Sequence, residues 1–343
     1  MSYYYPLKQL NKDVRKRTIG NLLELRKQLN REIPQKTATN TFLLATWNIR
    51  EFSDNRTKES LFYIAEIISR FDLVAVQEVS SNLKGLEDLK KLLDWNWDYI
   101  VTSPTEGTAG GGERMAFLYD RSKIMFKKMA GEVVLPKDKL IDGLQFARTP
   151  YTVSFQANWF KFVLSTVHII YGSSVDITKR EKEINAITSF LSKRAKKENT
   201  SYVLLGDFNI PNEDDVTMKA LERYGFSVPA AIKEHPSDLG GTSHYDQIAF
   251  NLKLDDNMVI FSADQKAGAF NFIETIYREQ DLETYKEYFH DKIAGMTEKE
   301  IRNYYLTKWR TFQMSDHLPL WVELKIDFSD PYLDKLQKEI TVQ

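Results

Sequence analysis

Residues 202–211 read Tyr-Val-Leu-Leu-Gly-Asp-Phe-Asn-Ile-Pro, an apolar run of strand length that carries Asp207 and Asn209 at its end. Side chains two apart on a strand point to the same face of the sheet. We therefore expect a carboxylate and a carboxamide to stand side by side where a buried strand meets solvent. An Asx turn at the end of an ordinary strand is the alternative, and this stretch alone does not separate the two interpretations.

Polar residues also end other apolar segments of the chain. Expected strands at 41–48, 71–79 and 161–167 lead to Asn48, Glu78 and His168. A buried strand that ends in an acid indicates a partner or a metal for that acid, because an unpaired buried charge is costly. Amphipathic helical patterns separate these strands, so the chain predicts a mixed α/β core.

Composition narrows the class of protein. The chain has 343 residues, 42% of them hydrophobic and 13% aromatic, which is enough for a large domain with insertions or for two domains. A net charge of −1 excludes a globally basic nucleic-acid-binding protein, although a local basic groove is still allowed. The absence of cysteine excludes disulfides, thiolate metal sites and cysteine nucleophiles.

The domain pattern changes at both ends of the chain. We expect an N-terminal helical extension over 1–40, a main domain over 41–328 and a C-terminal tail over 329–343. Strand–helix alternation stops at about 264–312, which predicts a helical insertion whose aromatic residues form a small core rather than a platform for bases.

The N-terminus has no apolar signal core, and no apolar run approaches membrane-spanning length. We expect no membrane association and a cytoplasmic location, unless a signal peptide has been removed. The sequence carries no signal for an oligomeric state.

The polar residues at expected strand ends share one property, since all are oxygen or imidazole donors: Asn48, Glu78, Glu113, His168, Asp207, Asn209, Asp246, Asp316 and His317. Such donors suit Mg²⁺ or Mn²⁺ rather than structural zinc. Histidines near carboxylates supply acid–base groups. Together these features indicate hydrolysis of a phosphate ester by activated water.

These residues lie in an ordered series of seven short motifs: Trp-Asn48-Ile-Arg50, Gln-Glu78-Val, Glu113-Arg114-Met-Ala-Phe-Leu-Tyr, Thr-Val-His168, Gly-Asp207-Phe-Asn209, Tyr-Asp246-Gln-Ile and Ser-Asp316-His317-Leu-Pro. The series resembles the endonuclease/exonuclease/phosphatase superfamily, and within it the deoxyribonuclease I branch, from about residue 41 to residue 324. The resemblance implies a four-layer α/β/β/α sandwich of two mixed, largely antiparallel sheets, with the site at one edge.

The resemblance also implies roles at the metal and the attacking water. Glu78 would be the main metal ligand, with Asn48 and Asp316 beside it. The ion would be Mg²⁺, with Mn²⁺ or Ca²⁺ as alternatives. Asp207 and Asn209 would position or activate the water and hold the phosphate.

Proton transfer would fall to two histidines. The resemblance implies that His317 is oriented by Asp246. It also implies that His168, paired with Glu113, acts on the leaving-group side.

Three functions follow, in order of preference. Arg50 and Arg148 match positions where the nuclease branch contacts phosphates, which favours an endonuclease acting on DNA, with RNA as the alternative. The branch often carries a groove-contacting arginine soon after the metal-binding glutamate, whereas Ser80 and Ser81 stand here.

Near-zero net charge supports a phosphoesterase acting on a small or lipid phosphoester of the inositol phosphate or sphingomyelin type. A non-catalytic binding protein is disfavoured because both histidines and all the acids are intact.

Overall fold

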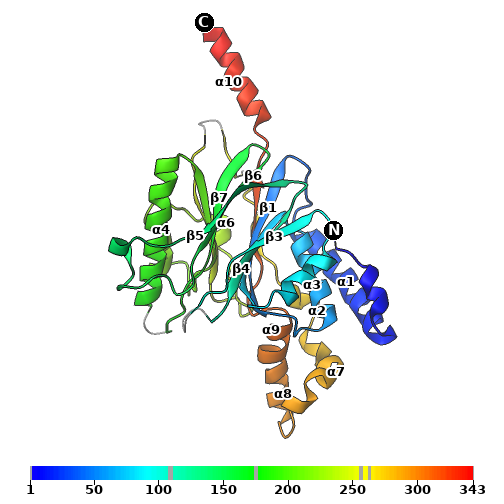
Figure 1. Cartoon of the computed structure of the whole chain (residues 1–343). Helices are drawn as coiled ribbons and strands as arrows, with labels where there is room; N and C mark the ends of the chain where they lie inside the picture. Colours follow the sequence, from blue (N-terminus) through cyan, green and yellow to red (C-terminus); the bar gives the residue numbers. More distant parts are fainter. Residues whose placement is uncertain (1, 107–110, 174–176, 255–257, 262–263, 343) are drawn as a thin grey trace.

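Two β-sheets lie face to face in the structure, a computed structural model that describes residues 2–106, 111–173, 177–254, 258–261 and 264–342 (Figure 1). The first sheet has the strand order β10 (Ala267–Ala269), β11 (Leu320–Lys325), β1 (Thr41–Phe52), β2 (Leu73–Val79), β4 (Arg114–Asp120) and β3 (Trp97–Val101). The second has the order β5 (Ile124–Glu132), β6 (Tyr151–Ala157), β7 (Phe160–His168), β8 (Ser201–Asp207) and β9 (Asp246–Asn251). Only the β1–β2 and β7–β8 pairs are parallel among these described strands, so both sheets are mixed and largely antiparallel.

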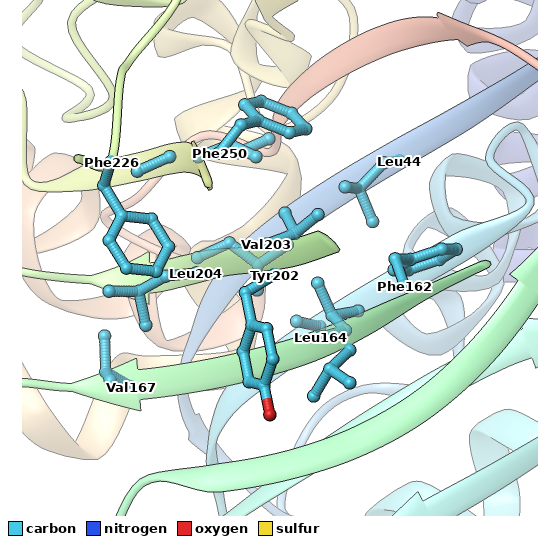
Figure 2. Close-up of a cluster of buried hydrophobic side chains, with 14 of the residues drawn as sticks. Leu44, Phe162, Leu164, Val167, Tyr202, Val203, Leu204, Phe226 and Phe250 are labelled. Carbon is cyan, nitrogen blue, oxygen red and sulfur yellow. The ribbon is translucent and has the colours of Figure 1, made fainter. Parts of the chain in front are cut away.

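The alternation of β1 explains how one strand serves two hydrophobic cores. Phe42 and Leu44 point into the core between the sheets, whereas Leu43, Ala45 and Trp47 belong to a second core. Successive side chains on a strand point to opposite faces, so a strand buried on both faces reads as a continuous apolar run. Figure 2 shows part of the buried cluster to which Leu44 belongs, with labelled side chains from β1, β7, β8 and β9.

Helices cover the outer faces of both sheets. On the first sheet lie α1 (Lys12–Glu32), α2 (Lys58–Ser69) and α3 (Lys84–Leu92), preceded by the short helix η1 (Tyr5–Gln9). On the second lie α4 (Thr178–Glu198), α5 (Val216–Glu222) and α6 (Ala230–Lys233), and the short helix η2 (Lys137–Lys139) precedes β6. This layering confirms the expected four-layer α/β/β/α sandwich.

Short helices form the insertion before β11: η3 (Phe272–Glu274), η4 (Glu279–Asp281), α7 (Leu282–Tyr285), η5 (Lys286–Lys292), α8 (Glu298–Tyr304), the π-helical turn η6 (Tyr305–Trp309) and α9 (Arg310–Gln313). They extend from one end of the first sheet (Figure 1). The helical part begins later than expected, because β10 lies inside the 264–312 range and pairs with β11. Tyr277 and Tyr285 are buried in the second core, and their rings lie 4.8 Å apart.

The two ends of the chain behave differently. Helix α1 is tied to α2 by ion pairs from Arg17 to Glu59 (2.7 Å) and from Arg26 to Glu66 (2.6 Å). Helix α10 (Ser329–Val342) instead projects away from the sheets (Figure 1). None of the helices in the described ranges is both long and apolar enough to cross a bilayer.

Candidate active site

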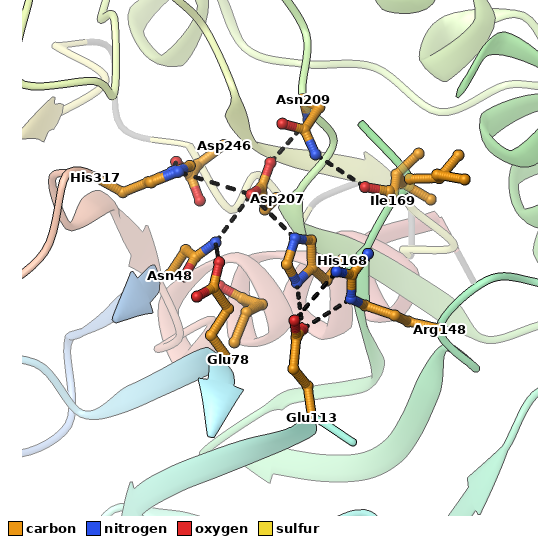
Figure 3. A network of polar contacts seen from close by, with 12 residues as sticks. Asn48, Glu78, Glu113, Arg148, His168, Ile169, Asp207, Asn209, Asp246 and His317 are labelled. Carbon is orange, nitrogen blue, oxygen red and sulfur yellow. Dashed lines mark hydrogen bonds and ion pairs between the residues drawn. The ribbon is translucent and has the colours of Figure 1, made fainter. Parts of the chain in front are cut away.

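Three strands of the second sheet bring polar side chains together at one edge. In the parallel β7–β8 pair His168 lies beside Asp207, and in the antiparallel β8–β9 pair Asp207 lies beside Asp246. Because β9 runs in the opposite direction, its first residue meets the last residue of β8. The sheet register therefore aligns a histidine and two carboxylates across three neighbouring strands (Figure 3).

Gly206 permits this close approach of β7 and β8. Its φ is +132°, and a Cβ atom at this position would lie 2.1 Å from the carbonyl oxygen of Val167. Only glycine accepts that conformation and that contact.

Asn209 is not placed as strand alternation predicted. Strand β8 ends at Asp207, and Asn209 has a left-handed φ of +53°. Its backbone N–H donates to Oδ1 of Asp207 at 2.8 Å, an Asx-type turn, and its Nδ2 donates to the carbonyl oxygen of Ile169 at 2.9 Å. The turn and the strand-end cluster, which the sequence offered as alternatives, occur together.

The first sheet contributes Asn48 from β1 and Glu78 from β2. Nδ2 of Asn48 lies 2.9 Å from Oε1 of Glu78 and 2.9 Å from Oδ2 of Asp207, so one amide group spans both sheets (Figure 3). Glu78 has a left-handed φ of +59°, unusual for a residue other than glycine. Such strain persists where surrounding contacts fix the side chain, and it is common at functional sites.

His168 and His317 each contact their own carboxylate through Nδ1 and direct Nε2 towards the same oxygen atom, Oδ2 of Asp207. Nδ1 of His168 lies 2.9 Å from Glu113, and Nδ1 of His317 lies 2.7 Å from Asp246. The Nε2 atoms lie 3.6 Å and 3.8 Å from Oδ2 of Asp207. Each carboxylate orients its imidazole, and each Nε2 faces the centre of the cluster.

The protonation of this cluster follows from its charges. Burial raises the pKa of Glu113, but hydrogen bonds from His168 and Arg148 more than offset burial and lower that pKa to about 2. Burial disfavours the charged form of His317, yet the negative charges of Asp246 and Asp207 raise its pKa well above the ordinary value. Glu113 is therefore ionised at neutral pH, and the two carboxylates beside His317 make its imidazole a stronger base.

The two arginines expected to bind phosphates already have protein partners. Arg148 lies before β6 and forms a forked ion pair with Glu113, through Nε at 2.7 Å and Nη2 at 3.1 Å. Arg50 donates from Nη1 to Oγ1 of Thr311 at 2.7 Å. The Arg148 contact joins it to the Glu113–His168 pair, which the sequence alone did not reveal.

The proposed metal ligands differ in position. Asp316 is half exposed and lies 3.9 Å from Arg50, whereas Asn48 and Glu78 touch each other. Across the described ranges no group of three or more acidic, histidine or cysteine side chains is placed to hold a metal ion.

Two oxygen donors nevertheless fit a hard cation. Oδ1 of Asn48 is buried without a hydrogen-bond partner, next to the carboxylate of Glu78. Mg²⁺ needs only one or two protein carboxylates, because water and substrate phosphate fill its other positions.

Two buried residues hold the backbone of His317 in place, although the sequence interpretation assigned them no role in the site. Oγ of Ser315 donates to the carbonyl oxygen of Asn48 at 2.6 Å and accepts from the backbone N–H of His317 at 2.9 Å. Nε1 of Trp47 donates to the carbonyl oxygen of His317 at 2.9 Å. The role of Ser315 could have been suspected from its place in the Ser-Asp-His motif, whereas nothing in the sequence separates Trp47 from an ordinary core residue.

Comparison with known proteins identifies the class. A model of the Endonuclease/Exonuclease/phosphatase family matches residues 45–255, more than half of the chain, and the chain belongs to this family. Members of this family typically use divalent metal ions.

Among curated proteins, the chain is similar to Deoxyribonuclease-1 of Bos taurus, with 27% identity over 182 residues that cover 48% of this chain and 60% of that protein. Deoxyribonuclease-1 of Rattus norvegicus is 27% identical over 183 residues, with 49% and 60% covered. The match spans about 60% of the length of these relatives.

Solved structures share the fold. An endonuclease/exonuclease/phosphatase family protein from Bacteroides thetaiotaomicron has a TM-score of 0.54 and 17% identity, covering 84% of this chain and 99% of its own. A mannosyl-6-phosphatase from the same organism has a TM-score of 0.53 and 17% identity, covering 82% and 99%. TDP2 from D. rerio, complexed with a single strand DNA product, has a TM-score of 0.54 and 12% identity, covering 83% and 98%.

Proposed function

We propose that this chain is a metal-dependent endonuclease that hydrolyses phosphodiester bonds of DNA. One observation carries the proposal. The Nε2 atoms of His168 and His317 converge on Oδ2 of Asp207, at 3.6 Å and 3.8 Å, and each imidazole is oriented by its own carboxylate. The distant similarity to Deoxyribonuclease-1 supports DNA as the substrate, with RNA as the alternative nucleic acid.

The two histidines supply what hydrolysis of a phosphodiester requires. One group must take a proton from the attacking water and another must give a proton to the leaving alcohol. We assign His168, held by Glu113, to the leaving-group side, and His317, held by Asp246, to the other proton transfer. Asp207 lies between them and orients the attacking water, and Asn209 holds the turn that fixes Asp207.

A divalent cation would be held by Glu78 and Asn48, with Asp316 as a further carboxylate. When bound, the ion stabilises negative charge on the phosphate and lowers the pKa of coordinated water. We expect Mg²⁺, with Mn²⁺ and Ca²⁺ as alternatives, because the donors are oxygen atoms.

A small or lipid phosphoester is the second candidate substrate, and a specific observation favours it. The preference for a polymer depended on Arg50 and Arg148, yet Thr311 and Glu113 already bind their guanidinium groups. A net charge of −1 supplies no general attraction to DNA. The mannosyl-6-phosphatase of similar fold acts on a small phosphoester, as its name states.

One comparison separates these functions. The purified protein is incubated with Mg²⁺ and supercoiled plasmid, linear duplex DNA, RNA or a phosphoinositide, beside an Asp207→Asn control of nearly unchanged shape. We expect the wild type to nick the plasmid and the control to leave it intact. Release of phosphate from the phosphoinositide with all nucleic acids intact would contradict the nuclease proposal. A folded wild type that is inactive on every substrate would favour a non-catalytic binding protein.

A further inference from the structure

We infer that Arg56 is a positioning residue for Glu78, and that the helical insertion holds Arg56 in place. This inference rests on the proposed role of Glu78 as a metal ligand. Arg56 lies between β1 and α2, outside all seven motifs, and only 6% of its surface is exposed. No carboxylate among the described residues lies within ion-pair distance of Arg56, and such deep burial of an arginine requires an explanation.

One peptide group joins Arg56 to Glu78. The carbonyl oxygen of Arg50 accepts a hydrogen bond from Nη2 of Arg56. The N–H of the same peptide group belongs to Glu51, and it donates to Oε2 of Glu78 at 2.9 Å. Hydrogen bonds in series polarise one another, so the guanidinium strengthens the donor that faces the Glu78 carboxylate.

The carboxylate of Glu78 is consequently fixed at both oxygen atoms. Oε1 accepts from Nδ2 of Asn48, and Oε2 accepts from the N–H of Glu51, both at 2.9 Å. Glu51 has a left-handed φ of +46°, so this donor depends on a strained backbone. Nη1 of Arg56 also donates to the carbonyl oxygen of Glu51 at 2.9 Å, which holds the strained residue from its other side.

Two aromatic rings enclose the Arg56 guanidinium. Its central carbon lies 5.3 Å from the ring centroid of Phe52 and 5.3 Å from that of Phe312. Burial lowers the pKa of Arg56 to about 10, and the group still carries its charge at neutral pH. The rings stabilise the cation and leave its N–H groups directed at the backbone.

Phe312 belongs to α9, the last helix of the insertion, and its two neighbours contact the same segment. Oγ1 of Thr311 accepts from Arg50 at 2.7 Å. Oε1 of Gln313 accepts from the backbone N–H of Thr57 at 2.9 Å. Three consecutive residues of α9 therefore hold residues 50–57 along their length, and the insertion sets the position of the backbone that faces Glu78.

Mn²⁺ affinity, measured by isothermal titration calorimetry, tests this inference without any substrate. We expect Arg56→Met to bind Mn²⁺ about 10–100-fold more weakly than the wild type, the usual effect of losing a group that orients a metal ligand. Arg56→Lys keeps the charge but cannot reproduce the two separate donors to the carbonyl oxygens of Arg50 and Glu51, so we expect a smaller loss of Mn²⁺ affinity. Phe312→Leu leaves Arg56 itself intact, and we expect an intermediate loss.

Phe289→Leu is the matched control. Phe289 is also buried in the insertion, but its ring contacts are with Tyr304, Tyr305 and Trp309 rather than with residues 50–57. We expect this variant to lower the melting temperature and to keep the Mn²⁺ affinity of the wild type.

The outcomes distinguish the two levels of inference. Wild-type affinity in Arg56→Met, or in Phe312→Leu if Arg56→Met does not fold, would overturn the positioning role. Equal losses in Phe312→Leu and Phe289→Leu would overturn it as well, because general destabilisation would then account for both. Failure of the wild type itself to bind Mn²⁺ would instead overturn the proposed metal site on which the inference rests.

Discussion

Nδ2 of Asn48 lies 2.9 Å from Oδ2 of Asp207, and this hydrogen bond joins the first sheet to the second at the edge where the two histidines meet. The same nitrogen lies 2.9 Å from Oε1 of Glu78. One amide group thus fixes the distance between the proposed metal ligand and the carboxylate that faces the histidines.

Activity should depend on a divalent cation. Excess chelator should abolish hydrolysis and added Mg²⁺ or Mn²⁺ should restore it, because oxygen donors prefer hard ions. Glu78→Ala should lose both turnover and Mn²⁺ affinity, measured by rate assay and by calorimetry. Undiminished hydrolysis in excess chelator would falsify the proposed metal dependence.

Both histidines should be needed for turnover. General acid–base groups contribute roughly 10²–10⁴-fold each, so His168→Ala and His317→Ala should each lower kcat by about that factor. The exposed His290 in the insertion supplies the control, since His290→Ala should leave kcat unchanged. If His317→Ala retained kcat within about threefold of the wild type, its assigned role would be wrong.

Glu113 should stabilise the fold at neutral pH and lose that effect in acid. Its pKa is about 2 in the folded protein, below the unfolded value of about 4.3, so the stabilisation is present above pH ~4.3 and disappears as the pH falls towards 2. Urea unfolding at several pH values should show Glu113→Gln less stable by about 2 kcal/mol at pH 7, after allowance for solvent screening. This difference should shrink at pH 3, and a difference that grew on acidification would have the wrong sign.

The two arginines should respond differently to substitution. Arg148→Ala removes the partner of Glu113 and should therefore slow hydrolysis of long DNA and of a small chromogenic phosphodiester alike. Arg50→Ala should weaken cleavage of DNA and lower the log–log salt slope of duplex binding by about one unit, while sparing the small ester. An unchanged salt slope in Arg50→Ala would remove a main reason for preferring a polymeric substrate.

Gly206→Ala should be among the most damaging small substitutions in the core. The added methyl group would overlap the carbonyl oxygen of Val167, and the backbone conformation is one that alanine rarely adopts. We expect a loss of at least about 2 kcal/mol in unfolding free energy, measured by urea denaturation. Gly131→Ala is the control, since a Cβ there meets no atom within 4 Å, and equal losses in the two variants would show that contact with β7 is unimportant.

The four-layer fold and the family could be predicted from the sequence because apolar strands and their terminal polar residues are local signals. The alternation of side chains along a strand gave the wrong position for Asn209, because β8 ends at Asp207 and Asn209 lies in a left-handed turn. The contact between Arg56 and Phe312 could not be predicted, since the two residues are far apart in the chain and neither belongs to a motif. The Arg148–Glu113 pair was missed because Arg148 lies outside the motifs and 35 residues from Glu113, and a side-chain contact at that separation carries no signature in either segment alone.

The division of the cluster between the two sheets has a consequence for folding. Glu78 belongs to the first sheet and His168 to the second, so neither half of the molecule contains the whole site. A state that kept both sheets but lost the packing between them would retain its secondary structure and lose the assembled site. A phosphate group that contacts residues of both sheets would therefore stabilise the docked state by mass action.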